Sequence, residues 1–269
     1  MIADILATIL EHKRTVELPA RRARVPLAAL RAQAEQAPAP RDWVGALRAG
    51  EHVALIAEIK CASPSKGVFA PQPFDPLHWA RVYDANGAAA ISVLTDEAFF
   101  KGAPAHLQDV RRVTERPLLR KDFVIDAYQV YEARAWGADA VLLIVAALDE
   151  VQLADLHALA QSLGLAPLVE VHDPHEVERA LRVGARVIGV NNRDLRTFRT
   201  DLATTARCAA ALRGVSGITL VSESGIFTAE DVARVATFGA HAVLVGEALI
   251  TAADPAAQVR ALARVRRVG

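Results

Sequence analysis

The sequence has little that would tie the protein to a membrane, to nucleic acid or to a disulfide framework. Its 269 residues include only two cysteines, Cys61 and Cys208, which is too few for such a framework and fits a reducing compartment. The 31 basic residues balance the 31 acidic ones, which removes the electrostatic attraction of nucleic acid or an anionic membrane. The longest apolar runs, such as residues 141–148, are too short to cross a bilayer. We therefore expect a soluble, cytoplasmic protein with no nucleic-acid or membrane partner.

Signals for secretion and for metal binding are also missing. Residues 1–14 carry Asp4 within their apolar stretch and lack a basic start, so they predict an amphipathic helix rather than a signal peptide. His and Cys residues do not have the spacing of a zinc site. His172 and His175 stand at a predicted strand-to-helix turn without an evident third ligand, and we interpret them as structural. We predict no metal site.

From about residue 53 onward, two patterns alternate along the chain. Short runs rich in Val, Ile and Leu, typical of parallel strands buried on both faces, are followed by stretches of helical periodicity such as 126–136, 149–163 and 228–238. The eight runs are 53–60, 88–96, 117–123, 138–146, 166–173, 185–194, 218–225 and 240–250. Eight units with short links predict an α/β fold, a (βα)8 TIM barrel, with an open doubly wound sheet as the alternative.

The residues between the units support the same fold. A glycine stands between a helix and the next strand at Gly87, Gly137, Gly184 and Gly239, where the chain often needs a positive φ. Residues 173–176 and 228–231 have the pattern of helix starts. Residues 1–50 are helical by pattern, interrupted by prolines and too few to bury a core of their own. We predict one domain over residues 1–269, in which an N-terminal helical extension (1–50) packs on the barrel (51–269).

Charged and amide side chains stand at the ends of the predicted strands, although burying an unpaired ion there is expensive. They are Glu58 and Lys60, Lys121, Glu170, Asn191 and Arg193, and Glu223. Because barrel enzymes have their active sites at the mouth formed by the carboxyl ends of the strands, we expect these side chains to face one cavity. The alternative is that Lys60 and Lys121 form structural ion pairs with Glu58 and Glu170.

Lysine is scarce, which makes its positions informative. Only five of the 31 basic residues are lysines, and three of them are Lys60, Lys66 and Lys121. Since the pKa of a lysine, unlike that of an arginine, shifts readily with its surroundings, lysine at a strand end favours acid–base chemistry. Two further segments, 223–225 and 245–248, follow the seventh and eighth strands, where barrels commonly bind phosphate through backbone N–H groups.

The sequence contains five notable motifs: IAEIKCASPSKG (56–67), LRKDF (119–123), LVEV (168–171), IGVNNRDL (188–195) and VSESGI (221–226). Together they resemble the indole-3-glycerol phosphate synthase family of tryptophan biosynthesis. The first motif is long and specific, and the five follow in the family's order across nearly the whole barrel. The helical extension before them is similar as well.

The resemblance implies a decarboxylating lyase without a cofactor. Its phosphorylated small-molecule substrate, 1-(2-carboxyphenylamino)-1-deoxyribulose 5-phosphate, would be cyclised, decarboxylated and dehydrated to indole-3-glycerol phosphate. By motif, Lys121 would be the general acid that activates the ribulose carbonyl, and Glu170 the general base that removes a proton as water leaves. Lys60 would lie near the substrate carboxylate and share the acid role. The groups that orient the others would be Glu58, Asn191 and Glu223.

The remaining substrate contacts are also implied by the resemblance. The sugar phosphate would be held by Ser63, Arg193, Ser224, Gly225, Gly246 and Glu247, with Gly246 and Glu247 acting mainly through their backbone. The anthranilate ring needs an apolar wall, for which Phe99, Phe100 and Phe123 are candidates. Since Lys121 would be buried beside another cation, we expect its pKa to be lowered.

Two positions depart from the family pattern. Cys61 stands where the family usually has a basic residue, and we expect its side chain to point away from the side of Lys60. Glu247 occupies a position often held by serine, and a carboxylate pointing at phosphate would repel it, which favours a backbone contact.

Two rival functions stay open at this point. One is another phosphate-binding barrel enzyme, such as phosphoribosylanthranilate isomerase. The other is an inactive barrel that serves as a binding subunit, although no expected catalytic position is missing. The sequence leaves the oligomeric state undecided between a monomer and an association with other tryptophan-pathway enzymes.

Overall fold

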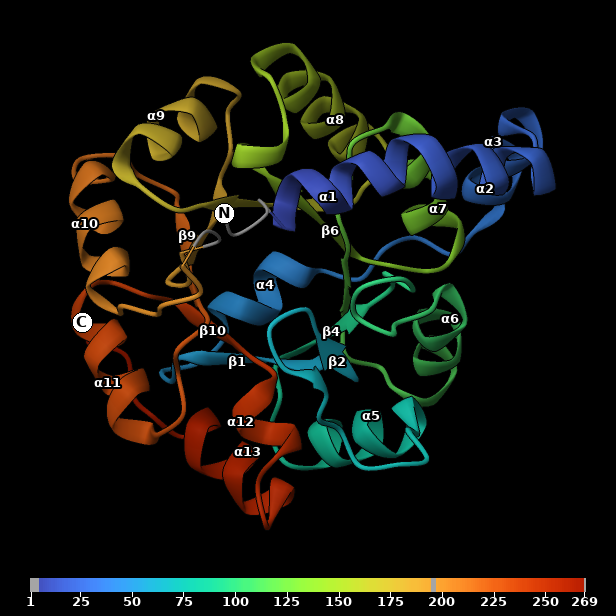
Figure 1. Cartoon of the computed structure of the whole chain (residues 1–269). Helices are drawn as coiled ribbons and strands as arrows, with labels where there is room; N and C mark the ends of the chain where they lie inside the picture. The colour runs from blue at the N-terminus through green and yellow to red at the C-terminus, as the bar shows by residue number, and fades with distance from the viewer. Residues whose placement is uncertain (1–4, 195–196, 269) are drawn as a thin grey trace.

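A computed structural model describes residues 5–194 and 197–268 as a closed barrel of eight parallel strands (Figure 1). The strands are β1 (Ala54–Ile59), β4 (Ala90–Leu94), β5 (Leu118–Lys121), β6 (Ala140–Ile144), β7 (Ala166–Val171), β8 (Val187–Asn191), β9 (Thr219–Glu223) and β10 (Ala242–Val245). Each pairs with its neighbours in chain order, and β10 closes the barrel on β1. The predicted (βα)8 barrel is confirmed.

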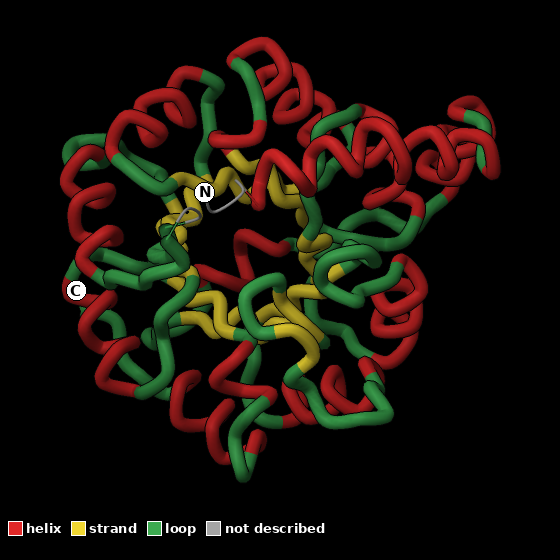
Figure 2. The backbone as a smooth tube through the Cα atoms, viewed as in Figure 1, coloured by secondary structure: helices red, strands yellow, loops and turns green. Residues whose placement is uncertain are grey.

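A ring of helices surrounds the strands (Figure 2). It consists of α5 (Pro76–Ala85), α6 (Pro104–Val113), α7 (Ala127–Ala135), α8 (Glu150–Ser162), α9 (Pro174–Arg182), α10 (Ala203–Ala211), α11 (Ala229–Thr237) and α13 (Pro255–Ala263). The loops add a 3-10 turn η2 (Val145–Ala147) and a small hairpin of β2 (Ala62–Ser63) and β3 (Gly67–Val68). Within the described ranges, no helix is both long and apolar enough to span a bilayer.

The expected helix boundaries are accurate where capping residues set them. Asp173 accepts the N–H of Glu176 at 2.8 Å and starts α9, while Thr228 and Asp231 form a capping box at α11. Gly137 (φ 85°) and Gly184 (φ 80°) have the left-handed backbone that lets a helix end and a strand begin. The apolar run 240–250 contains two elements: β10 ends at Val245, and residues Glu247–Ile250 form the short helix α12. An apolar run does not reveal by periodicity alone where strand becomes helix.

The extension contacts both ends of the barrel. It comprises α1 (Ile5–His12), a π-helical turn η1 (Lys13–Glu17), α2 (Leu18–Arg24), α3 (Leu27–Gln36) and α4 (Trp43–Arg48). Helix α4 contacts β1, β4 and β9 and lies across the amino ends of the strands, seen inside the barrel ring in Figures 1 and 2. Helix α1 lies over the carboxyl ends, and α3 packs on α7. Residues 1–4 of the predicted N-terminal helix and Leu195 of the fourth motif lie outside the described residues.

Candidate active site

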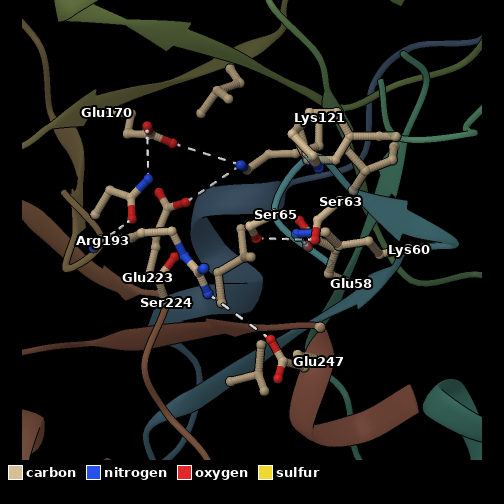
Figure 3. Close-up of a pocket in the computed structure, with 18 of the residues that line it drawn as sticks. Glu58, Lys60, Ser63, Ser65, Lys121, Glu170, Arg193, Glu223, Ser224 and Glu247 are labelled. Carbon is tan, nitrogen blue, oxygen red and sulfur yellow. Dashed lines mark hydrogen bonds and ion pairs between the residues drawn. The ribbon is translucent and has the colours of Figure 1, made fainter. Parts of the chain in front are cut away.

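A pocket opens at the carboxyl ends of the strands, and all the residues predicted for the site except Phe99 line it (Figure 3). These residues are Glu58, Lys60, Ser63, Phe100, Lys121, Phe123, Glu170, Asn191, Arg193, Glu223, Ser224, Gly225, Gly246 and Glu247. They come from loops or strand ends around the whole barrel, far apart in the sequence. Cys61 is buried and does not line the pocket, as expected from its alternation with Lys60.

Lys121, at the end of β5, points between two buried carboxylates. Its Nζ lies 3.6 Å from Glu170 Oε2 and 3.8 Å from Glu223 Oε2, as the dashed lines in Figure 3 mark. Burial by itself lowers the pKa of Lys121, but the charges of Glu170, Glu223 and Glu58 outweigh it, so the pKa rises above its ordinary value. The lowered pKa predicted for Lys121 was therefore wrong, because the nearby carboxylates raise the pKa by more than burial lowers it. Lys121 is fully protonated at neutral pH.

Glu170, in β7, is kept ionised by its neighbours. Burial raises the pKa of this carboxyl, but the charges of Lys121 and His172 lower the pKa by more than burial raises it. The net shift is downward. Asn191 Nδ2 donates to Glu170 Oε1 at 3.1 Å. His172 Nε2 lies 3.4 Å from the same oxygen, and its Nδ1 lies 3.1 Å from Glu176 Oε2. The sequence had suggested a structural role for His172; its position two residues after Glu170, directly after β7, was the signal that the two side chains would meet.

Glu223, in β9, behaves in the opposite way. Burial and the nearby charge of Glu170 raise its pKa to about 8, although Lys121 partly offsets this rise. Gly189 faces Glu223 across the β8–β9 pair, and any side chain there would collide with the carboxylate. The two carboxyl groups beside the Lys121 ammonium thus have different pKa values, lowered for Glu170 and raised for Glu223. Such a difference allows one group to accept a proton while the other stays protonated.

Lys60 follows β1 and lies in a more open environment. Its Nζ is 3.7 Å from Glu58 Oε1 and 5.2 Å from the centre of the Phe100 ring. Burial lowers the pKa of Lys60; Glu58 opposes this effect, while Lys121 and Arg193 add to it. Of the two lysines in the pocket, Lys60 therefore gives up its proton more easily.

These charge contacts are ion pairs, but they are longer than good hydrogen bonds. Good N–H···O hydrogen bonds measure about 2.7–3.2 Å, whereas the Lys121 and Lys60 contacts lie at 3.6–3.8 Å. Glu170 Oε2 and Glu223 Oε1 are buried and accept no hydrogen bond from the described residues. Both ion pairs of the predicted alternative, Lys60–Glu58 and Lys121–Glu170, are present, and the acceptors left open in the cavity point to a ligand that completes them.

The phosphate end of the pocket, defined by Ser224, Gly225, Gly246 and Glu247, is formed by turns after β9 and β10. Ser224 (φ 66°) and Gly225 (φ 75°) both have left-handed backbone, which turns the chain sharply at the pocket wall. At Gly246 an added Cβ would lie 2.8 Å from Glu58 Oε1, so glycine leaves room for the Glu58 side chain of β1 beside this turn.

The Glu247 side chain is paired with cations. Glu247 Oε1 binds Lys66 Nζ, and its Oε2 lies 4.0 Å from the Arg193 guanidinium. The carboxylate is therefore neutralised from two sides. Ser63 contributes a hydroxyl, 3.4 Å from that of Ser65, from the hairpin loop after β1.

The aromatic wall, formed by Phe100 and Phe123, lies at the ends of β4 and β5. The two rings are 5.8 Å apart and tilted by 38°. Phe99, the third candidate, packs edge-on against His12 at 5.5 Å and does not line the pocket. Sequence reasoning missed other apolar lining residues: Ile5, Leu6 and Ile9 of α1, Leu142, Phe198 and Phe227. The amphipathic pattern of α1 indicated an apolar face but not what that face covers.

Comparisons with known proteins bear on the whole chain. A family model described as indole-3-glycerol phosphate synthase matches residues 6–262. A relative named indole-3-glycerol phosphate synthase from Roseiflexus sp. strain RS-1 is 58% identical over 264 residues, 96% of this chain and 97% of the relative. Another of that name, from Azoarcus sp. strain BH72, is 50% identical over 97% of this chain and 99% of the relative.

Solved structures of more distant barrels share the fold alone. A 3-hexulose-6-phosphate synthase from Salmonella typhimurium superposes with a TM-score of 0.60 at 16% identity, over 78% of this chain and 97% of that one. A thiamine phosphate pyrophosphorylase from Pyrococcus furiosus gives 0.57 at 18% identity, over 78% and 93%. At such identities the likeness extends to the barrel and no further.

Proposed function

We propose how this pocket works from one premise: the chain belongs to the indole-3-glycerol phosphate synthase family. It is a decarboxylating lyase of tryptophan biosynthesis, and its substrate is 1-(2-carboxyphenylamino)-1-deoxyribulose 5-phosphate. The reaction closes a carbon–carbon bond onto the ribulose ketone, releases CO2 and then eliminates water. Such a sequence needs proton donors at the ketone and hydroxyl oxygens and a base for a C–H proton, all facing one cavity.

The ammonium of Lys121 between two buried carboxylates is the observation that carries the assignment of roles. Lys121, which holds its proton at neutral pH, donates it to the ketone oxygen as the aromatic ring attacks. Glu170, which is ionised, removes the C–H proton as water leaves. Its pKa is held down by Lys121, so the loss of the Lys121 proton makes Glu170 a stronger base for this later step.

Lys60 supplies the second cation. Its lowered pKa suits a donor that protonates the departing hydroxyl, and its position beside Glu58 and over the Phe100 ring suits contact with the carboxylate of the anthranilate half. Asn191 orients Glu170 by its hydrogen bond, and Glu58 and Glu223 hold the two lysines. CO2 leaves most readily once the substrate carboxylate gives up this ionic contact.

The two ends of the substrate match the two ends of the pocket. The anthranilate ring packs on the aromatic wall, Phe100 and Phe123, under the apolar face of α1. The phosphate binds at the phosphate end, where backbone N–H groups and the hydroxyls of Ser63 and Ser224 are donors. Because the Glu247 carboxylate is already paired with Lys66 and Arg193, that residue meets the phosphate through its backbone.

The enzyme works in the cytoplasm as a monomer under this proposal. Both cysteines are free and buried, which suits a reducing compartment. All the residues assigned above come from one chain. Association with other tryptophan-pathway enzymes stays a prediction.

The test is direct turnover. Purified protein given the carboxyphenylamino-deoxyribulose phosphate, with a chelator and no nucleotide, is expected to develop indole fluorescence and release CO2. A Glu170→Gln variant purified in the same way is expected to form little product, which controls for contaminating enzyme. Phosphoribosylanthranilate, offered in parallel, is expected to remain unchanged. An inactive wild-type protein, or one that isomerises phosphoribosylanthranilate, overturns the proposal.

A further inference from the structure

Lys13, in the π-helical turn η1, carries a buried charge that the reaction does not use. Its side chain is fully buried and does not line the pocket. Its Nζ lies 2.7 Å from Asp122 Oδ1, 3.0 Å from Asp96 Oδ2 and 2.7 Å from Glu17 Oε2. Taking an ammonium and three carboxylates out of water is costly, and a better-packed apolar group would serve stability as well. The cluster therefore calls for a second explanation.

The two aspartates bound by Lys13 shape the aromatic wall. Asp96, which follows β4, accepts the backbone N–H groups of Phe99 at 2.7 Å and Phe100 at 3.0 Å. Asp122, directly after Lys121, accepts the N–H of Phe123 at 2.8 Å. Each carboxylate thus fixes the turn that presents one ring of the wall, and Lys13 joins the two carboxylates.

The same helical segment also forms part of the pocket. Ile5, Leu6 and Ile9 of α1 line it, and Lys13 follows Ile9 by four residues, on the same helical face. The helix widens into a π-turn at Lys13, a feature that often accompanies functional sites. One face of the extension therefore contributes apolar residues to the pocket and also carries Lys13, which binds this segment to the barrel.

The charged groups around this cluster come from several elements. Arg120 of β5 donates to Asp122 Oδ2 at 2.9 Å, and Thr95 donates to the same oxygen at 2.7 Å. Asp122 therefore has donors on both oxygens, and Lys13 is the charged group that holds Oδ1, the oxygen that also accepts the Phe123 N–H. Because Lys121 directly precedes Asp122 in the chain, any movement of Asp122 also moves the backbone that carries the Lys121 side chain.

We propose that Lys13 is a positioning residue: it locks helix α1 and the loops after β4 and β5 into the one arrangement that aligns the aromatic wall with Lys121. This inference rests on the proposed function, in which the aromatic half of the substrate packs on that wall. Lys13 contacts no substrate. It acts through Asp96 and Asp122, so its removal disturbs the aromatic side of the pocket and leaves the phosphate end in place.

Three variants test this role: Lys13→Met, which keeps the length and removes the charge, Lys13→Arg, which keeps the charge, and Arg22→Met as the control. Arg22 lies in the same extension and pairs with Asp126 at 2.6 Å, but its side chain is 52% exposed. For each variant, kcat and KM are measured by indole fluorescence, Ki by competition with inorganic phosphate, and Tm by circular dichroism.

Lys13→Met is expected to lose roughly 10- to 100-fold in kcat/KM, as misplacement of a catalytic group by about 1 Å can do. Its Ki for inorganic phosphate is expected to stay within about twofold of wild type, since the phosphate end is formed by other strands. Lys13→Arg recovers most of the loss, and Arg22→Met shows none. A mere loss of folded protein would lower kcat alone and leave KM unchanged.

A folded Lys13→Met with wild-type kcat/KM, or with a phosphate Ki that rises in parallel, overturns the inference. If Lys13→Met does not fold, Asp96→Asn takes its place, because the amide oxygen still accepts the Phe99 and Phe100 N–H groups while the ion pair is lost. Asp96→Asn is expected to lower kcat/KM and to leave the Ki for inorganic phosphate unchanged, as Lys13→Met does. If Asp96→Asn does not show this pattern, the inference is overturned equally. A wild-type protein without turnover would instead refute the proposed function.

Discussion

The two ends of the barrel use buried charge in opposite ways. At the amino end, Asp139 accepts the backbone N–H of Arg41 at 2.7 Å on one oxygen, and that of Leu118 at 2.6 Å together with the Arg111 guanidinium on the other. At the mouth, Lys121 stays 3.6 and 3.8 Å from its two carboxylates, and two carboxylate oxygens there accept no hydrogen bond from the described residues.

The difference separates what stability needs from what chemistry needs. Asp139 ties the extension to the start of β5 and β6, and its oxygens have nothing left to bind. The mouth carboxylates keep free acceptors in a site that is equally buried. A protein can hold such incompletely bonded groups only if the rest of the fold is stable enough, so the well-bonded end of the barrel supports the reactive one.

The largest effect is expected for Lys121→Met. Loss of the ammonium removes the general acid, and kcat is expected to fall about 10³-fold, equivalent to roughly 4 kcal/mol in the barrier. KM is expected to change little, because the ring and phosphate contacts remain. Steady-state indole fluorescence measures both, with Lys101→Met, an exposed lysine outside the pocket, as the control. A kcat within tenfold of wild type would contradict the role.

Asp139→Asn tests the stabilising role of buried charge at the amino end of the barrel. Removing this buried charge is expected to lower the free energy of unfolding by about 3 kcal/mol and Tm by roughly 5–10 °C. At 25 °C the folded variant is expected to keep wild-type kcat and KM. Asp109→Asn, which removes an exposed pair with Arg112, is the stability control. Unchanged stability, or a loss of kcat without a loss of stability, would show that the two ends are not so divided.

Glu223→Gln is expected to stabilise the protein while it impairs turnover. In the folded protein the pKa of Glu223 is raised to about 8, whereas its ordinary pKa is 4.5. The folded state therefore binds more protons within this window, and the contribution of Glu223 to stability falls as pH rises through it. Glutamine does not titrate, so its Tm is expected to exceed that of wild type by several degrees at pH 8.5 and by less at pH 5.

The exposed Glu178→Gln provides the control for that pH series. If Tm for Glu223→Gln tracks wild type at every pH, Glu223 is not protonated in the folded protein. A gain of equal size at pH 5 and pH 8.5 would mean that packing rather than proton binding is responsible.

His172→Asn is expected to have the smallest effect. Burial lowers the pKa of His172, but its contacts with Glu176 and Glu170 outweigh this and raise it, so the imidazolium lies beside the base and lowers the pKa of Glu170. Without it, the acid limb of the kcat/KM profile is expected to move to higher pH. His175→Asn, at an exposed neighbour, is expected to leave the profile unchanged. A shift to lower pH would exclude this electrostatic role.

The sequence was sufficient for the fold and for the residues that face the pocket, because both depend on local patterns. Alternating apolar runs and helix caps located the strands. Because the carboxyl ends of all the parallel strands lie at the same end of a closed barrel, residues at those ends face one pocket. Distances across the barrel follow no such pattern. The pKa of Lys121 was therefore predicted in the wrong direction, since the sequence shows Glu170 and Glu223 on separate strands but not their approach to one ammonium.

Lys13 was missed for a related reason. It stands in a helix with arginine and glutamate nearby, where a lysine is ordinarily solvated, and no periodicity shows that its partners lie on β4 and β5. Phe99 was expected at the pocket because it follows β4 beside Phe100, but its ring packs against His12, and the sequence does not show which of two adjacent rings in a turn faces the pocket.

Helix α4 has a consequence for the order of events during synthesis. Arg48 donates to the Ile218 carbonyl oxygen and the Thr219 hydroxyl, which lie 170 and 171 residues later in the chain. This helix leaves the ribosome before any barrel strand, yet it has no complete binding surface until β9 has been made. This helix, made before the strands it binds, is thus among the last elements to reach its final contacts, and until then its apolar face has to remain soluble without them.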